Sequence, residues 1–217
     1  MMQGKITAIE AQKRQRSRVN IHLDGAYAFS LDRLTAAWLQ LGQELSADAV
    51  QKLQASDELE AAHARALNLL SYRARSQHEV EQFLQQKGYT PALSGQVLER
   101  LKEQGYLDDL RFAREWIENR NTFRPRSKRA LRVELMRKGL ENATIEAALE
   151  QSLPDDSASL LQAGLKLGKR YRGLPREEFQ RKLAAALLRR GFAYAEVRET
   201  LPDLWSQLAP DSNTDTL

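Results

Sequence analysis

The sequence has no cysteine among its 217 residues, which excludes disulfides, thiolate catalysis and cysteine-ligated zinc. Its three histidines, His22, His63 and His78, stand singly and lack the spacing of metal ligands. No apolar run approaches the roughly 18 residues of a membrane span, and the first residues have no apolar signal core. We therefore expect a cytoplasmic protein without a metal or other cofactor and without membrane contact.

Motifs of catalysis are missing as well. The chain has no phosphate-binding Walker loop, no dinucleotide-binding GxGxxG and no GxSxG nucleophile turn. Asp108 and Asp109 form the one conspicuous carboxylate pair, but adjacent carboxylates before an apolar helical pattern are far more typical of helix caps. We expect no catalytic residues and no enzymatic activity.

What the sequence does have is positive charge in defined places. The whole chain carries a net charge of +4 and has a pI of about 9.4. Residues 111–139 hold ten Lys or Arg against three Glu, a net charge of +7, and residues 166–198 again hold ten against three. This concentration favours a polyanionic partner, either nucleic acid or an acidic protein surface.

The N-terminal region is the only one with strand-like patterning. Apolar residues alternate with polar ones from Val19 to Leu23 and again over 26–31, and Asp24-Gly25 between them is a hairpin turn signal. Residues 5–10 are a candidate third strand. Residues 31–41 are interpreted as a short helix that stops at Gly42. Ser46 is a candidate N-cap for a further helix that continues toward residue 72.

After this region the chain repeats. Gly88, Gly139 and Gly191 lie 51 and 52 residues apart, and each follows a cation at the end of an apolar helical pattern. Apolar residues stand eight and four positions before each glycine. They are Val80 and Leu84, Leu131 and Leu135, and Leu183 and Leu187. Ordinary amphipathic helices produce such pairs anywhere, but agreement of cation, glycine and both offsets in three copies favours a true repeat.

We therefore predict a mainly α-helical fold: an elongated array of three tandem three-helix repeats of about 50 residues with a small N-terminal β-hairpin and helix module. The expected domains are residues 1–58 for the N-terminal module, 59–105, 106–153 and 154–208 for the three repeats, and 209–217 for a disordered tail.

The repeated cations suggest a shared surface. They gather in the second helix of each repeat and in the link that leads to it. A solvated helix face is the simple interpretation, but arginine predominates, and arginine is suited to bidentate recognition of carboxylate or phosphate. The glycine turns also suggest a helix-turn-helix. The residues after them, such as Thr90-Pro91-Ala92 and Glu141-Asn142-Ala143, are poor donors for base reading. Contact with phosphates remains open.

Several of these segments resemble one known family. Residues 105–109, GYLDD, followed by Arg111-Phe112-Ala113, are similar to the most recognisable motif of the bacterial RecX regulatory proteins. The links 73–76 and 124–127 resemble that family's basic approach to the second helix, with Ala74 in place of the more usual proline. The N-terminal block, with Leu23-Asp24-Gly25, resembles the extension of longer members. The third repeat is looser, because Phe179 stands where Ser76 and Ser127 do in the others.

The resemblance implies a monomeric, non-enzymatic modulator of the recombinase RecA. Such proteins lie in the helical groove of the RecA filament on single-stranded DNA, bridge its protomers and suppress ATP hydrolysis, strand exchange and co-protease activity. Single- or double-stranded DNA is a further candidate partner. The alternatives are a nonspecific nucleic-acid-binding protein that acts without RecA and an adaptor for another assembly. The candidate contact residues are Arg73, Arg75, Arg111, Arg114, Arg124, Arg126, Lys128, Arg129, Arg132, Arg181, Lys182, Arg189 and Arg190.

Overall fold

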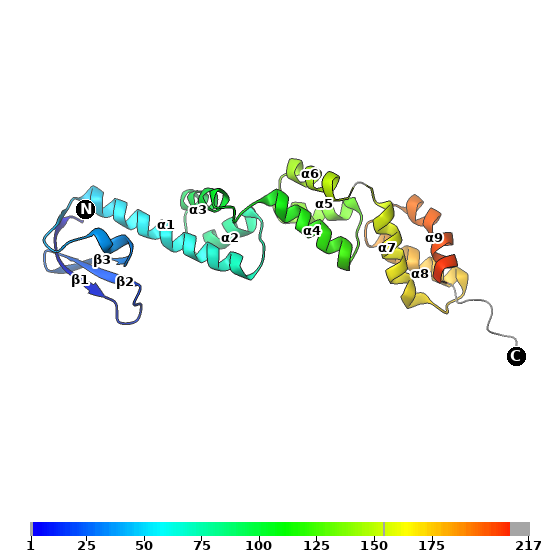
Figure 1. Cartoon of the computed structure of the whole chain (residues 1–217), viewed down its shortest axis with the longest axis horizontal. Coiled ribbons are helices and arrows are strands. Elements are labelled where there is room, and N and C mark those ends of the chain that lie inside the picture. Colours follow the sequence, from blue (N-terminus) through cyan, green and yellow to red (C-terminus); the bar gives the residue numbers. More distant parts are fainter. Residues whose placement is uncertain (1, 154, 209–217) are drawn as a thin grey trace. The chain divides into compact units, whose positions relative to one another are not determined.

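The computed structural model describes residues 2–153 and 155–208 and consists of two compact units (Figure 1). The first unit contains the N-terminal sheet, the long helix after it and the first helical repeat up to Tyr106. The second unit contains the other two repeats, together with Ala74–Glu79 from the start of the first repeat's second helix. The predicted tail, 209–217, lies outside the described residues.

The N-terminal strands form one antiparallel sheet of four strands in the order β3-β2-β1-β4. They span Gly4–Ala11, Arg18–Leu23, Ala26–Asp32 and Glu44–Leu45 for β1 to β4. The Asp24-Gly25 turn between β2 and β3 has positive φ at both residues, as the hairpin signal predicts. Ile6 of β1 joins Ile21 and Leu31 in the buried core, so the predicted two-stranded hairpin is part of a larger sheet.

The helix predicted over residues 31–41 is wrong. β3 continues to Asp32, and only a short 3-10 turn, Thr35–Trp38, follows it. The Asp32 carboxylate accepts a hydrogen bond from the Leu34 amide at 2.9 Å, which satisfies locally a group that would otherwise enter a helix. Of the turn's residues only Ala36 is buried, so the segment has no apolar face to hold a longer helix against the sheet.

A long helix joins the sheet to the first repeat within the first unit. α1 spans Ala47–Tyr72, and the Ser46 side chain accepts from the Ala49 amide, as predicted for an N-cap. The half of α1 nearer the sheet is tied to it by Asp57, whose carboxylate is 2.7 Å from the Arg18 guanidinium and also accepts from the Asp32 amide. The other half packs against α3 of the first repeat.

Each repeat has the predicted three helices, and the glycine turn sits at the same place in all three. In the first repeat the second and third helices are α2, Gln77–Gln86, and α3, Pro91–Glu103. In the second repeat they are α5, Lys128–Arg137, and α6, Asn142–Ser152. In the third repeat they are α8, Arg176–Leu188, and α9, Tyr194–Leu208. The upstream helices of the second and third repeats are α4, Asp109–Phe123, and α7, Ser157–Gly168. Gly88, Gly139 and Gly191 all have φ between +78° and +92°, the left-handed conformation expected after a helix.

Local sequence explains where these helices begin. Asp108 caps α4 by accepting from the Arg111 amide at 2.9 Å, and Ser127 caps α5 by accepting from the Ala130 amide at 3.2 Å. At the start of α2 the Ser76 hydroxyl accepts from the Glu79 amide while Glu79 reaches back to the Ser76 amide. This reciprocal arrangement is a capping box.

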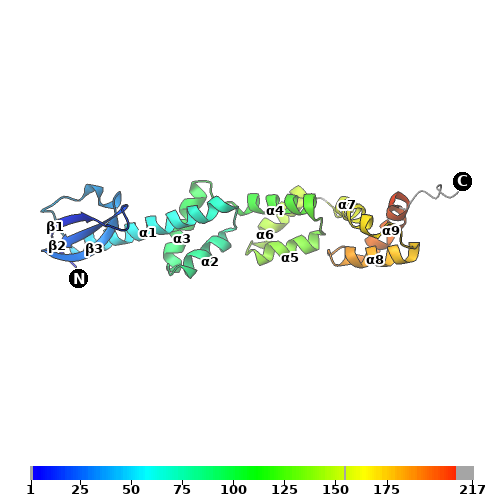
Figure 2. The same cartoon turned by 90° about the horizontal axis from the view of Figure 1, so that it is seen from below.

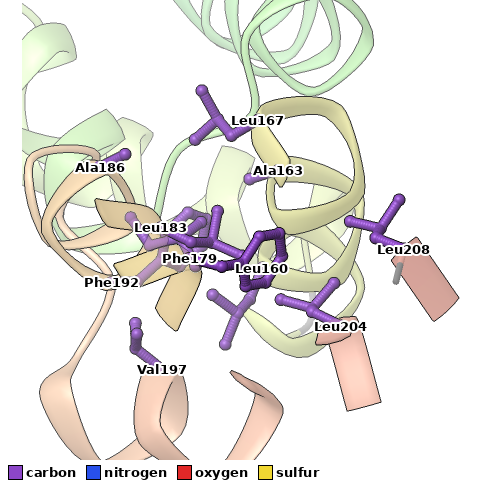
Figure 3. Close-up of a cluster of buried hydrophobic side chains, with 11 residues drawn as sticks. Leu160, Ala163, Leu167, Phe179, Leu183, Ala186, Phe192, Val197, Leu204 and Leu208 are labelled. Carbon is purple, nitrogen blue, oxygen red and sulfur yellow. The ribbon is translucent and has the colours of Figure 1, made fainter. Parts of the chain in front are cut away.

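The third repeat differs at the residue that aligns with these serines. Phe179 is buried in the repeat's own core (Figure 3). Its ring lies 5.1 Å from the Trp205 ring in an edge arrangement. Glycine lets α7 and α9 approach closely, because a Cβ at Gly164 would collide with the Leu204 side chain. α8 starts at Arg176, before Phe179, so it has 13 residues where α5 has 10. The serine position of the other repeats thus becomes a core position.

Consecutive repeats meet through a contact that occurs twice, which we call the joint. It joins the first turn of one repeat's second helix to the glycine turn and the upstream Asp of the following repeat. At one joint the Lys128 amide donates to Asp156 at 2.7 Å, and the Ser127 amide donates to the Arg190 carbonyl at 3.2 Å. The equivalent joint is formed by the Gln77 amide with Asp109, 2.9 Å, and the Ser76 hydroxyl with the Lys138 carbonyl, 2.6 Å.

The joint uses the polarity of helix ends. The free amides at the N-terminus of α5 meet a carboxylate and the carbonyl-rich C-terminal turn of α8, so partial charges of opposite sign face each other. Figure 2 shows α8 and α5 lying end to end within the second unit. This joint holds the second and third repeats together, and the link before α5, which carries several of the candidate cations, lies at it.

Candidate basic interface

A buried carboxylate organises the link before α5. Glu134 of α5 accepts hydrogen bonds from the Trp116 indole at 2.8 Å and the Arg120 guanidinium at 2.7 Å. Its other oxygen lies 2.7 Å from Arg126. Arg120 also stacks over the Trp116 ring at 4.5 Å, which is a cation–π contact. The predicted contact residue Arg126 is therefore used largely to position the link.

The guanidinium of Arg190 approaches this link from the other repeat. Its Nη1 donates to the Pro125 carbonyl at 3.2 Å, next to Arg124 and Arg126. Burial lowers the pKa of Arg190 below its usual value, and the positive charges of Arg124, Arg126 and Arg170 lower it further. The structure thus brings three of the predicted cations together, and it adds Arg170, which was absent from the predicted set.

Arg170 could have been found from the sequence by its spacing. It follows Lys166 by four residues, which places both on one side of the helical segment. The Lys166 ammonium donates to the carbonyls of Thr122 and Phe123 at 2.9 and 3.2 Å, at the C-terminal end of α4. In the structure α7 ends at Gly168, and Arg170 lies in the 3-10 turn Lys169–Tyr171 that follows, close enough to Arg190 for its charge to lower the pKa of Arg190.

Other predicted cations are engaged by carboxylates of their own repeat. Arg132 makes two hydrogen bonds to Glu146, of 2.5 and 2.8 Å, which raise the pKa of Arg132 and lower that of Glu146. Lys182 lies 2.8 Å from Glu178 on the preceding turn of α8. The hydrogen bond to Lys182 lowers the pKa of Glu178. These two cations contribute less net positive charge to a partner than the sequence suggests.

Exposed cations remain around the joint. Arg124, Arg129, Arg181 and Arg189 are all exposed, and none has an ion pair among the residues that the structure describes. Arg129 lines two shallow grooves that meet at Gly191, with volumes of about 330 and 420 Å³. Lys128 is half-buried beside it, with its main chain held by Asp156. This surface is the part of the predicted site that is most available to a ligand.

Two predicted groups lie elsewhere. Arg111 and Arg114 are exposed on α4 and line a groove of about 550 Å³, together with Glu115 and Glu118, so that groove carries both signs of charge. Arg73 belongs to the first unit, as the last residue before the segment Ala74–Glu79 of the second unit. Arg75, in the second, is half-buried with its Nε lacking a hydrogen-bond partner.

Four arginines gather near the joint between the second and third repeats. We call them the joint cluster: Arg124, Arg126, Arg170 and Arg190.

The described residues offer neither a metal site nor a membrane-spanning helix beside this surface. Across residues 2–153 and 155–208, no three His, Asp or Glu side chains are grouped so that they could hold a metal ion. None of the helices over the same residues is both long and apolar enough to span a membrane. The chemistry offered by the site is recognition of negative charge.

Comparison with known proteins gives one consistent family. Residues 4–46 match the RecX regulatory protein N-terminal domain. Residues 62–101, 108–149 and 155–201 match the first, second and third RecX three-helix domains. The Regulatory protein RecX of Bacillus subtilis is 32% identical over 215 residues, which cover 98% of this chain and 81% of the relative. That of Lactobacillus johnsonii is 33% identical, covering 86% and 70%.

Solved structures agree with these relatives. A crystal structure of regulatory protein RecX is similar with a TM-score of 0.70 and 28% identity, over 93% of this chain and 100% of the other. A crystal structure of RecX from Lactobacillus salivarius matches with a TM-score of 0.60 over 69% of this chain and 97% of the other; at 23% identity it supports the fold alone.

Proposed function

The chain belongs to the RecX family of regulatory proteins, which are not enzymes, and from this premise we propose that it binds the RecA filament on single-stranded DNA and restrains its activities. ATP hydrolysis, strand exchange and co-protease activity are the activities that it would suppress. The observation that carries the proposal is the exposed arginine surface around the joint between the second and third repeats, which is held on a repeated helical scaffold.

A protein built from helical repeats can contact a filament that is itself built from repeated protomers. In this proposal a monomer contacts successive protomers of the filament through the helical repeats, with the predicted bounds 59–105, 106–153 and 154–208, while the N-terminal module comprises 1–58. The joint makes one repeat's second helix start on the next repeat, which keeps the cationic links in a regular relation. Arg124, Arg129 and Arg189 are the central contacts, because they are exposed and unpaired among the described residues.

The decisive measurement is RecA-catalysed ATP turnover on single-stranded DNA with and without this chain. Wild type should lower the turnover. A triple variant with Arg124, Arg129 and Arg189 changed to Glu should lose this effect, because each reversal turns attraction to an acidic surface or phosphate into repulsion. Turnover that is unchanged by wild type would refute the proposed function.

A matched control separates local from general charge effects. Changing Lys13, Arg14 and Arg16 to Glu alters the net charge by the same amount, within an exposed loop of the N-terminal module. This control variant should retain inhibition. Circular dichroism should show equal helicity in both variants, since none of the six side chains is buried. Equal loss in both variants would indicate that net charge alone drives binding.

A nucleic-acid-binding protein that acts without RecA is the second candidate, because the arginine surface also fits phosphates. Titration against bare single-stranded DNA and against the filament at rising salt distinguishes the two. Binding to phosphates alone should fall log-linearly with salt concentration, whereas additional protein contacts should reduce that dependence for the filament.

A further inference from the structure

An exposed aromatic residue directly precedes Arg124 of the joint cluster in the sequence. Phe123 is the last residue of α4, directly before Arg124, and 67% of its surface is exposed. Phe112, on the same helix, lies in the core of the second repeat, whereas Phe123 does not. An exposed phenylalanine adjacent in sequence to an arginine cluster offers a flat apolar surface close to a source of positive charge.

Contacts of the main chain fix this arrangement. Lys166 holds the Thr122 and Phe123 carbonyls at 2.9 and 3.2 Å, so the end of α4 is pinned against α7. Arg170 lies in the 3-10 turn Lys169–Tyr171 that follows α7, and the Arg190 guanidinium donates to the Pro125 carbonyl at 3.2 Å. The aromatic ring and three arginines are therefore carried by segments that are bonded to one another.

The cluster lacks compensating negative charge. The carboxylate that pairs with Arg126, Glu134, also accepts hydrogen bonds from Trp116 and Arg120. Arg124, Arg170 and Arg190 form no ion pair within the described part of the chain. The lowered pKa of Arg190 reflects both its burial and the repulsion from its neighbours. A bound anion would relieve this repulsion, which favours a ligand rich in phosphate.

We propose that the joint cluster and Phe123 form a binding site for single-stranded nucleic acid. Arg124, Arg170 and Arg190 contact backbone phosphates, and one unpaired base stacks on the Phe123 ring. Arg126 stays with Glu134 and holds the link in place. A single strand fits this site better than a duplex, because paired bases are covered by their neighbours and cannot offer a free face to an isolated ring.

This site deepens the proposed function, since a RecA filament contains single-stranded DNA. It rests on that function only for its biological setting, because the test below contains no recombinase. Inhibition of RecA without binding at this site, or binding here without inhibition, would refute one proposal and leave the other standing.

The test is fluorescence anisotropy with a labelled oligothymidylate and with an abasic strand of the same length and charge. Phe123→Ala should weaken binding to oligothymidylate about tenfold and leave binding to the abasic strand unchanged, because only the stacking contact is lost. Phe123→Trp should preserve the affinity. Arg170→Gln should weaken binding to both strands and reduce the slope of log affinity against log salt by about one.

Controls come from equally exposed residues of the same chain. Tyr72→Ala removes an exposed aromatic ring at the end of α1, and Arg198→Gln removes an exposed cation on α9; neither should change affinity. The proposal is overturned if Phe123→Ala leaves the affinity for oligothymidylate unchanged, as Tyr72→Ala should. It is also overturned if Phe123→Ala weakens binding to the abasic strand as much as binding to oligothymidylate. It is also overturned if polyglutamate displaces the strand at equal charge concentration, which would assign the cluster to an acidic protein.

Discussion

The carboxylate of Asp156 accepts a hydrogen bond from the main-chain amide of Lys128 at 2.7 Å, across the boundary between two repeats. Asp109 does the same for Gln77 at 2.9 Å. In both cases an acidic residue near the start of one repeat's upstream helix satisfies an amide at the start of the preceding repeat's second helix. The repeats are therefore joined by a specific polar contact that recurs along the chain.

Loss of this contact should destabilise the second unit. Asp156→Ala removes the carboxylate that accepts a hydrogen bond from the Lys128 amide, and we expect a loss of about 1–2 kcal/mol in the free energy of unfolding. Asp156→Asn retains a carbonyl acceptor and should lose less. Urea unfolding monitored by circular dichroism measures both variants. Equal stability of Asp156→Ala and wild type would show that the joint contributes no net energy.

The three turn glycines should respond differently to alanine. Gly88→Ala should cost about 1–2 kcal/mol from positive φ alone, because a Cβ at Gly88 would meet nothing within 4 Å. A Cβ at Gly139 would overlap the His78 side chain, and one at Gly191 would lie 2.6 Å from the Ser127 hydroxyl. Gly139→Ala and Gly191→Ala should therefore lose about 1 kcal/mol or more beyond Gly88→Ala.

Thermal unfolding of the three alanine variants ranks these effects. The order expected is Gly88→Ala as the most stable, with the two joint glycines below it. If Gly88→Ala were the most damaged, steric contact at the joint could not be the reason why those positions require glycine.

The Arg132–Glu146 pair should contribute a small stability that depends on pH. The hydrogen bond from Arg132 lowers the pKa of Glu146 in the folded state. Its contribution is therefore complete above the unfolded pKa of about 4.3 and disappears as the pH falls through the lower folded value. Because both side chains are well exposed, we expect less than about 1 kcal/mol at neutral pH.

Comparison of wild type with Glu146→Gln tests this pH dependence. The difference in unfolding free energy should be constant near neutrality and shrink in acid, where the wild-type carboxylate becomes protonated. A difference that grows as the pH falls would contradict the assigned direction of the pKa shift.

Neighbouring arginines in the link should separate into a structural and a contact role. Arg126→Ala removes a partner of the mostly buried Glu134, and we expect a loss of about 1 kcal/mol in stability. Arg124→Ala should leave stability unchanged, because Arg124 is exposed and has no ion pair among the described residues. Only Arg124→Ala should weaken ligand binding without a change in melting temperature. Equal melting temperatures of both variants would remove the distinction.

The sequence by itself determined the repeat. Glycine after a helix, a preceding cation and apolar residues at fixed offsets are local signals, because backbone strain and helix amphipathicity depend on neighbours in sequence. The same locality explains the correct N-cap at Ser46. It also explains the error at residues 31–41, where helical spacing alone could not reveal that most of the segment has nothing to pack against.

Tertiary structure alone decided which cations are available. A count of charges in the sequence does not distinguish the arginines of this segment. In the structure, however, Arg124 is exposed, Arg126 is paired with Glu134 and Arg132 is paired with Glu146. Arg170 and Phe123 enter the site only because Lys166 pins α7 to the end of α4. Charge is a property of each residue, but its accessibility depends on partners that lie far away in sequence and close in space.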